Sequence, residues 1–349
     1  MGLSFRIFVQ ANKEMTMKIK IPKRFIWAFI FLILVSLACQ GTSAPTATPA
    51  PDTQSEASQP TNPPQLGVAP VSLPEKRENQ AGDPDSSANA KRKLVSSGEK
   101  FVKGIYERPF NAVTMDTYFP YLDIVDTQGF KDEEWGYATI SLSGTDANGK
   151  LPGTYGVELD LNRDGRGEWL ILAANPTSTD WSTQGVQAWN DANGDIGGSA
   201  PTIADENSPG NGYESLVFDQ GKGNNVDDAW AHVSAEDPKT IIIAFRLSLL
   251  GNPDSFAMGS WAGSKSYLIP ALFDFNDHMT HMDAGSPLPD LYVYPLKKLA
   301  EIDNTCRLAI GFFPSGNEPG LCETIIHQEP GVPVVGCTPP AAGIMNPCP

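Results

Sequence analysis

The chain alternates between apolar and polar residues over short stretches, which is typical of β-strands that bury one face. Residues 154–161 place four apolar side chains on one face and Glu158 and Asp160 on the other, and residues 135–142 and 240–250 alternate in the same way. Five further stretches are predicted to be strands: 121–125, 169–173, 185–189, 213–218 and 229–233. Gly, Asn, Asp and Pro separate these stretches, and long helical periodicity is missing. The pattern predicts an all-β fold, an immunoglobulin-like or jelly-roll antiparallel β-sandwich with long loops, over residues 101–305.

One stretch of this body resembles a known group of domains. Residues 240–251, which read Thr-Ile-Ile-Ile-Ala-Phe-Arg-Leu-Ser-Leu-Leu-Gly and are followed by Phe256 and Gly259, are similar to the late strand and turn of CBM9-like and DOMON-like β-sandwiches. Residues 156–164 are similar to the central acidic strand of the same domains. The resemblance covers residues 115–275. Since these families include sugar-binding and haem-binding modules, it implies an extracytoplasmic binding domain, and no binding residue is carried over from it.

The N-terminus has the pattern of an export signal. Residues 1–24 hold six basic residues and one acid, and residues 25–38 are uncharged and end at Cys39. A membrane span needs about 20 apolar residues, so this run is predicted to be a signal peptide over residues 1–38. Residues 34–40 resemble the lipobox of bacterial lipoproteins, in which the cysteine is joined to diacylglycerol, although Ser36 stands where that family prefers Leu. The alternative is an ordinary secretory signal cut after Ala44. We therefore expect a protein of the bacterial cell envelope, extracytoplasmic and held to a membrane by a lipid on Cys39.

The next segment, residues 39–100, is predicted to be a lipidated and disordered tether. Residues 40–100 contain nine prolines, many Thr and Ser residues, and no aromatic residue. With so few side chains to bury, such a segment does not offset the entropy lost on ordering. Aromatic residues return at Phe101, where the folded body is predicted to begin.

The charge balance is strongly acidic. The chain has 25 Lys and Arg against 41 Asp and Glu, a net charge of −16. Without residues 1–38 the counts become 25 − 6 = 19 and 41 − 1 = 40, a net charge of −21. Nucleic-acid binding depends on cationic side chains that neutralise phosphates, so no nucleic-acid partner is expected. The same charge repels anionic lipid, so the lipid on Cys39 is the expected membrane contact.

Four cysteines besides Cys39 lie in residues 306–349, the predicted disulfide-stapled C-terminal extension. They are Cys306, Cys322, Cys337 and Cys348. Four cysteines allow three pairings, and neighbours in sequence would close the shortest loops. A zinc site usually shows close Cys-x-x-Cys pairs, which this sequence lacks. Two disulfides in an oxidising compartment are therefore favoured over a metal.

Two acidic turns carry the spacing of a calcium loop. The first places oxygen-bearing side chains at positions 1, 3 and 5 and a glycine at position 6: Asp160, Asn162, Asp164 and Gly165. The second repeats the spacing with Asp191, Asn193 and Asp195. An EF-hand needs an acid at position 12, where this chain has Ile171 and Thr202, so a looser Ca²⁺ site on β-loops is predicted. Glu168, Asp205 and Glu206 are its candidate helpers. The alternative is that these residue types cluster because they stabilise tight turns.

The remaining chemistry is aromatic. Trp181 and Trp189 are the candidates for stacking on sugar rings, against the alternative that tryptophans in a sandwich belong to the core. The chain lacks a Gly-x-Ser-x-Gly elbow and a P-loop. The sequence thus predicts a non-catalytic binding domain for a carbohydrate or another extracellular ligand, such as a surface protein. The alternatives are a glycoside hydrolase-like enzyme with Asp/Glu pairs, and a purely structural or adhesive surface protein.

Overall fold

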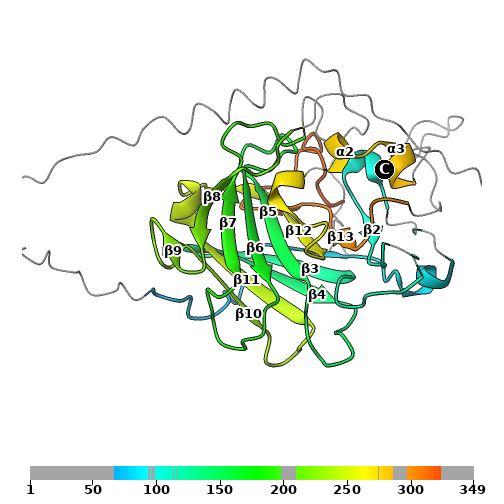
Figure 1. The fold of residues 1–349 in the computed structure, drawn as a ribbon. Coiled ribbons are helices and arrows are strands. Elements are labelled where there is room, and N and C mark those ends of the chain that lie inside the picture. The colour runs from blue at the N-terminus through cyan, green and yellow to red at the C-terminus, as the bar shows by residue number, and fades with distance from the viewer. Residues whose placement is uncertain are drawn as a thin grey trace, which may run out of the picture. The chain divides into compact units, whose positions relative to one another are not determined.

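The computed structural model describes residues 67–92, 95, 99–112, 114, 116–197, 210–273, 275–285 and 297–323. Two antiparallel β-sheets pack face to face, so the predicted all-β sandwich is confirmed (Figure 1). Cys39, Cys337, Cys348, Asp205 and Glu206 lie outside the described residues. Within the described residues, none of the helices has the length and apolar character needed to cross a membrane.

The smaller sheet has five strands in the order β1-β3-β4-β11-β10. Their bounds are β1 Asn79–Gly82, β3 Ile124–Lys131, β4 Trp135–Leu142, β11 Thr240–Arg246 and β10 Ala229–Val233. The predicted strands at 135–142 and 229–233 are confirmed to the residue. The stretch 240–250 divides into β11 and the 3₁₀ turn η4, Leu247–Leu250.

The larger sheet follows the order β2-β13-β12-β5-β6-β7-β8-β9, and β14 also pairs with β12. Its strands are β2 Glu107–Arg108, β13 Ile302–Asn304, β12 Phe256–Gly263, β5 Thr154–Asp160, β6 Trp169–Ala174, β7 Val186–Asn190, β8 Ser215–Asp219, β9 Lys222–Gly223 and β14 Leu308–Ile310. The short helices are η2 Ser87–Arg92, η3 Phe101–Lys103, η5 Pro270–Leu272, α2 Phe275–His278 and α3 His281–Ala284.

The main core lies between the two sheets, and the alternation seen in the sequence builds it. Val157 and Leu159 of β5 face Ile241 and Ile243 of β11, and all four side chains are buried. The opposite face of β5 is also buried, which the alternation does not predict. A second buried cluster, rich in aromatic residues, covers that outer face. It contains Phe101 of η3, Phe275 of α2, Phe273 just before α2, and Trp261 of β12. Polar side chains of β5 are therefore enclosed rather than exposed to solvent.

The expected domain boundaries need correction at both ends of the body. β1 lies inside the predicted tether of residues 39–100, yet it pairs with β3, with Gln80 opposite Gln128. β14 lies inside the predicted extension of residues 306–349, yet it pairs with β12. Both strands are held through backbone hydrogen bonds and are only three or four residues long, so apolar alternation cannot reveal them. The described body therefore begins before Phe101 and continues past Thr305.

Candidate functional site

The first acidic turn joins β5 to β6, and its carboxylates hold the backbone of the turn. Asp160 Oδ1 accepts a hydrogen bond from the Arg163 N–H at 2.5 Å, and Asp160 Oδ2 accepts one from the Gly165 N–H at 2.8 Å. Arg163 and Gly165 have positive φ angles of 65° and 93°. Glu168 Oε2 accepts from the Leu161 N–H at 2.6 Å. These are the local hydrogen bonds that favour Asp in tight turns.

The same turn brings three carboxylates together. One oxygen from each of Asp160, Asp164 and Glu168 lies within 4.8 Å of the others. Two oxygens bound to one Ca²⁺ at about 2.4 Å can be at most about 4.8 Å apart, so the spacing fits a shared cation. Asn162 differs from the expectation, because its side-chain nitrogen donates to Glu168 Oε1 at 2.6 Å and its oxygen accepts from the Asp164 N–H at 2.8 Å.

Burial changes the protonation of these carboxylates. It raises the pKa of Asp160, although Arg307 acts in the opposite direction. Burial also raises the pKa of Glu168 to about 7, and the charges of Asp160 and Asp164 contribute to the increase. A cation at this turn would favour the ionised form of Glu168 and lower that pKa.

The second acidic turn follows β7 and is organised in the same way. Asp191 Oδ1 accepts from the Gly194 N–H at 2.7 Å, and Asp191 Oδ2 accepts from the Ile196 N–H at 3.0 Å. Asn193 Oδ1 accepts from the Asp195 N–H at 3.1 Å. Within the described part of the chain, these residues do not join a group of three metal-ligating side chains.

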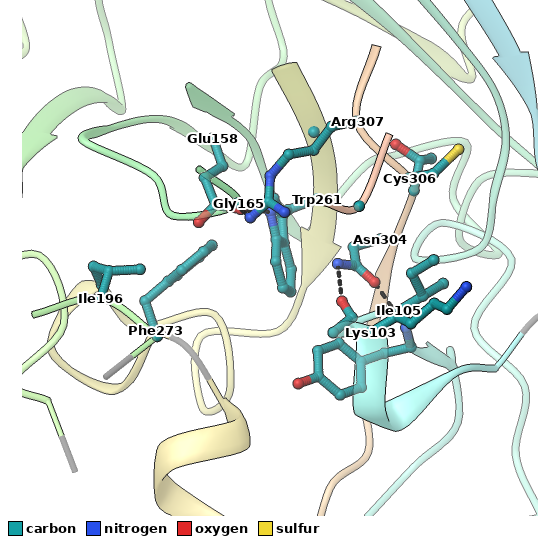
Figure 2. A pocket seen from close by; sticks show the side chains of 16 residues that line it. Lys103, Ile105, Glu158, Gly165, Ile196, Trp261, Phe273, Asn304, Cys306 and Arg307 are labelled. Carbon is teal, nitrogen blue, oxygen red and sulfur yellow. Dashed lines mark hydrogen bonds and ion pairs between the residues drawn. The ribbon is translucent and has the colours of Figure 1, made fainter. Parts of the chain in front are cut away.

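The two turns lie beside each other because β5, β6 and β7 are neighbours in the larger sheet. The Asp191 N–H donates to the Glu168 backbone oxygen at 3.0 Å. A partly open recess lies next to both turns, and Gly165 and Ile196 form part of its wall (Figure 2). Sequence spacing identifies each turn but not the recess between them.

A buried carboxylate with three donors forms one side of this recess. Glu158 Oε1 accepts from the Tyr213 hydroxyl at 3.0 Å. Glu158 Oε2 accepts from Arg307 Nη2 at 3.1 Å and from Trp261 Nε1 at 3.3 Å. Figure 2 shows the guanidinium of Arg307 and the indole of Trp261 beside Glu158. The recess therefore combines an ion pair with an aromatic wall.

Arg307 is itself incompletely paired. Burial alone would lower its pKa, but the carboxylates of Glu158 and Asp160 outweigh that effect and raise it. Its Nε atom is buried and has no hydrogen-bond partner among the described residues. A buried donor without an acceptor is unfavourable, so this atom marks a place where an oxygen from a ligand or water would be stabilising.

Backbone pairing and a disulfide position Arg307. In the register of β5 and β12, Glu158 lies opposite Gly259, and a Cβ at Gly259 would lie 3.3 Å from Cγ of Arg307. Cys306 and Cys322 form a disulfide with their Cα atoms 4.9 Å apart, as predicted. The Cys322 N–H also donates to the Arg307 backbone oxygen at 2.9 Å. The disulfide thus joins the segment that carries Arg307 to the segment of Gly320, which also lines the recess.

The two predicted tryptophans lie elsewhere and on different faces. The Trp181 ring is 4.3 Å from the His232 ring and packs on the outer face of the smaller sheet. Trp189 packs at the edge of the aromatic cluster on the outer face of the larger sheet, and its Nε1 donates to Gln187 Oε1 at 3.2 Å. Neither lines the recess, whereas Trp261 does. The sequence does not single out Trp261 from the other tryptophans, because both faces of β12 are buried and the strand shows no alternation.

Comparisons with known proteins add no family to this description. Searches against protein-family models, curated proteins and solved structures found no match to this chain. The class of protein is therefore defined by the fold alone, a two-sheet antiparallel β-sandwich. Any functional conclusion has to come from the recess and the turns beside it.

Proposed function

We propose that this chain is a non-catalytic binding protein whose recess takes an oxygen-rich ligand, a carbohydrate in the first instance. The supporting observation is the buried Arg307 Nε, which lacks an acceptor within the described residues and belongs to a side chain that lines the recess. A hydroxyl, ring or carboxylate oxygen of a sugar would accept from it. Trp261 and Phe273 contribute the apolar part of the wall, although both side chains are almost completely buried in the surrounding aromatic cluster.

Binding fits the recess better than hydrolysis does. Glycoside hydrolases use two carboxyl groups placed on either side of the scissile bond. Glu158 is the only carboxylate among the described lining residues, and three donors already occupy its oxygens. A carboxylate held in this way is a poor general acid or nucleophile, so the hydrolase alternative has less support.

The first described residues contact the face of the sandwich opposite the recess. The Val68 N–H donates to Asp227 Oδ2 at 3.4 Å, and Leu73 packs against the aromatic cluster on the outer face of the smaller sheet. The recess lies on the outer face of the larger sheet, on the other side of the sandwich. If a lipid on Cys39 anchors the chain, the recess would lie on the face of the sandwich opposite Val68 and Leu73.

Calcium at the first acidic turn is the second part of the proposal. Asp160, Asp164 and Glu168 would share the ion, and Asp160 also interacts with Arg307. A bound cation would compete with Arg307 for Asp160 and would leave more of the guanidinium to the ligand. Ca²⁺ is therefore expected to strengthen ligand binding as well as the turn.

Retention on a panel of insoluble polysaccharides, with Ca²⁺ and then with EDTA, tests this proposal. The informative variant is Glu158→Gln with Arg307→Gln, which removes both charges, keeps the shape of the Glu158 side chain and shortens that of Arg307. We expect it to lose retention by tenfold or more, on the order of one charge-assisted hydrogen bond. Trp181→Ala, on the opposite face of the sandwich, is the matched control and should bind as the wild type does.

Two results would contradict the proposal. If Trp181→Ala abolishes retention and the recess variant does not, the sugar site is the aromatic cluster of the smaller sheet. If the wild type is retained by no polysaccharide and captures only a protein from the cell surface, the adhesive alternative is correct.

A further inference from the structure

Four carboxylates from separate segments of the chain gather where an edge of the smaller sheet meets an edge of the larger one. Asp83 follows β1, Asp123 precedes β3, Glu107 belongs to β2 and Asp303 belongs to β13. Glu107, Asp123 and Asp303 are completely buried. One oxygen from each of Asp83, Glu107 and Asp303 lies within 4.8 Å of the others, and Asp123 is close enough to raise the pKa of both Glu107 and Asp303. We call these four residues the carboxylate cluster.

Strand pairing and backbone hydrogen bonds hold this cluster in place. Asp303 lies directly opposite Glu107 in the pairing of β13 with β2, an unfavourable position for two like charges. The Ile124 N–H, at the start of β3, donates to Asp303 Oδ2 at 2.6 Å and links the two sheets. The Ser86 N–H donates to Asp123 Oδ2 at 3.1 Å, and the Ser86 hydroxyl donates to Glu107 Oε2.

These hydrogen bonds occupy only one oxygen of each completely buried carboxylate. The other oxygen of each has no hydrogen-bond partner among the described residues, and neither does one oxygen of Asp83. The four atoms are Asp83 Oδ2, Glu107 Oε1, Asp123 Oδ1 and Asp303 Oδ1. Buried carboxylate oxygens are almost always paired, so four of them in one cluster would be stabilised by bound protons or, when ionised, by a shared cation.

The described residues supply no cationic side chain to this cluster. Burial is the main cause of their raised pKa values, and neighbouring carboxylates add to the increase, while a side-chain interaction with Glu107 lowers the pKa of Asp83. Arg108 is next to Glu107 in sequence, but its guanidinium forms an ion pair with Glu99 at 2.5 Å and donates to the Ala284 backbone oxygen at 2.8 Å. Among the described residues the cluster therefore has no positively charged partner, and a bound cation would supply one.

We propose that the carboxylate cluster is a buried Ca²⁺ site, with Asp83, Glu107 and Asp303 as ligands and Asp123 beside them. An all-oxygen set without His or Cys favours a hard cation over zinc or copper. Ca²⁺ accepts several protein carboxylates in irregular geometry, whereas Mg²⁺ keeps most of its waters and is seldom enclosed by protein alone. The ion would join the segment after β1 to β2, β3 and β13 and would close that edge of the sandwich.

This site is separate from the proposed function. None of its four residues lines the recess or belongs to the first acidic turn. The residues proposed to hold the buried ion differ from those proposed to contact the sugar, although Asp303 directly precedes Asn304, which lines the recess. The two proposals can therefore fail independently.

The test is calcium content and thermal stability of the full-length protein in detergent. Glu107→Gln with Asp303→Asn removes two charges from the cluster with little change in shape, and Asp164→Asn with Glu168→Gln does the same at the acidic turn. By equilibrium dialysis at low micromolar Ca²⁺, we expect the cluster variant to bind one ion fewer than the wild type. The turn variant should keep that ion.

Melting temperatures give a second readout whose sign depends on the ion. In Ca²⁺ the wild type should melt above the cluster variant, because the ion stabilises only the intact site. In EDTA the order should reverse, because the variant lacks the repulsion between the two buried carboxylates. A wild type that melts at the same temperature in Ca²⁺ and in EDTA, with equal Ca²⁺ content in both proteins, would overturn the proposal.

Two further outcomes are also decisive. If the cluster variant does not fold, the turn variant decides. A turn variant that retains the ion and melts at a higher temperature in Ca²⁺ than in EDTA supports the buried site. A turn variant that does neither overturns it. An equal rise in melting temperature with Mg²⁺ alone would overturn the assignment to Ca²⁺.

Discussion

The first acidic turn and the carboxylate cluster are two groups of acidic residues that the fold treats in opposite ways. In the turn, both oxygens of Asp160 accept backbone N–H donors, and Asp164 remains exposed to solvent. In the cluster, three carboxylates are fully buried, and each keeps an oxygen that has no hydrogen-bond partner within the part of the chain that the structure describes. In the turn, backbone N–H groups already stabilise the Asp160 carboxylate, and a cation would add to that stabilisation. In the cluster, a cation would be the partner of oxygens that have no other partner among the described residues. Spacing in the sequence points to the first group, and the second is the stronger candidate for a structural ion.

The largest expected difference between the two groups is in stability. Asp303→Ala removes a buried carboxylate that accepts from the Ile124 N–H, so in Ca²⁺ we expect a loss of about 3–5 kcal/mol of unfolding free energy. Asp164→Ala, at the exposed position of the turn, should cost less than about 1 kcal/mol. Urea unfolding of both variants measures the difference. Equal losses would mean that burial does not distinguish the two groups.

The next difference is in the response to pH without calcium. Burial raises the pKa of Asp83 and of Asp123 to about 7, and it raises those of Glu107 and Asp303 well above their usual range. Between pH 4 and 7 the folded state therefore binds more protons than the unfolded state, and stability falls as the pH rises through the folded pKa values.

In EDTA we therefore expect the melting temperature to fall by roughly 5 °C or more between pH 5 and pH 8. Saturating Ca²⁺ should remove this fall, because the ion binds the deprotonated carboxylates. The variant Glu107→Gln with Asp303→Asn should show a shallower fall in EDTA. A wild-type melting temperature that rises between pH 5 and pH 8 in EDTA would show that ionisation of the cluster does not destabilise the fold.

The smallest expected effect is at Glu168. The pKa of this half-buried carboxyl is raised to about 7, but solvent screening limits what its charge costs. Glu168→Gln keeps an oxygen that can accept from the Leu161 N–H, so in EDTA at pH 8 the unfolding free energy should change by less than about 1 kcal/mol. The wild type and the variant should differ more in Ca²⁺ than in EDTA. If they differ equally in both, the acidic turn is only a turn.

The sequence predicts those parts of the molecule whose signal is local. Residues 135–142 and 229–233 alternate in polarity and form strands with those bounds, and Asp160 and Asp164 meet Glu168 through a single hairpin. The disulfide of Cys306 with Cys322 closes a short loop, which is why pairing of neighbours was the favoured choice.

The sequence does not predict contacts that depend on distant pairing. Glu107 and Asp303 meet only because β2 pairs with β13, and each of these strands is too short to show a period. The recess depends in the same way on Gly259 lying opposite Glu158 across two strands. β1, which reads Asn-Gln-Ala-Gly, has no apolar alternation, and the composition around it predicts a disordered tether.

The position of β1 at the edge of the smaller sheet has a mechanical consequence. β1 pairs only with β3, over four residues, and the chain that precedes it leads toward the N-terminus. A force applied from the N-terminus would first break the contacts of Val68 and Leu73 with the body and would then reach β1, and Asp83 is the residue that follows β1. With Ca²⁺ on the carboxylate cluster, the sandwich would resist force at Asp83 rather than unravel. Single-molecule pulling from the N-terminus should then show an unfolding force that EDTA lowers.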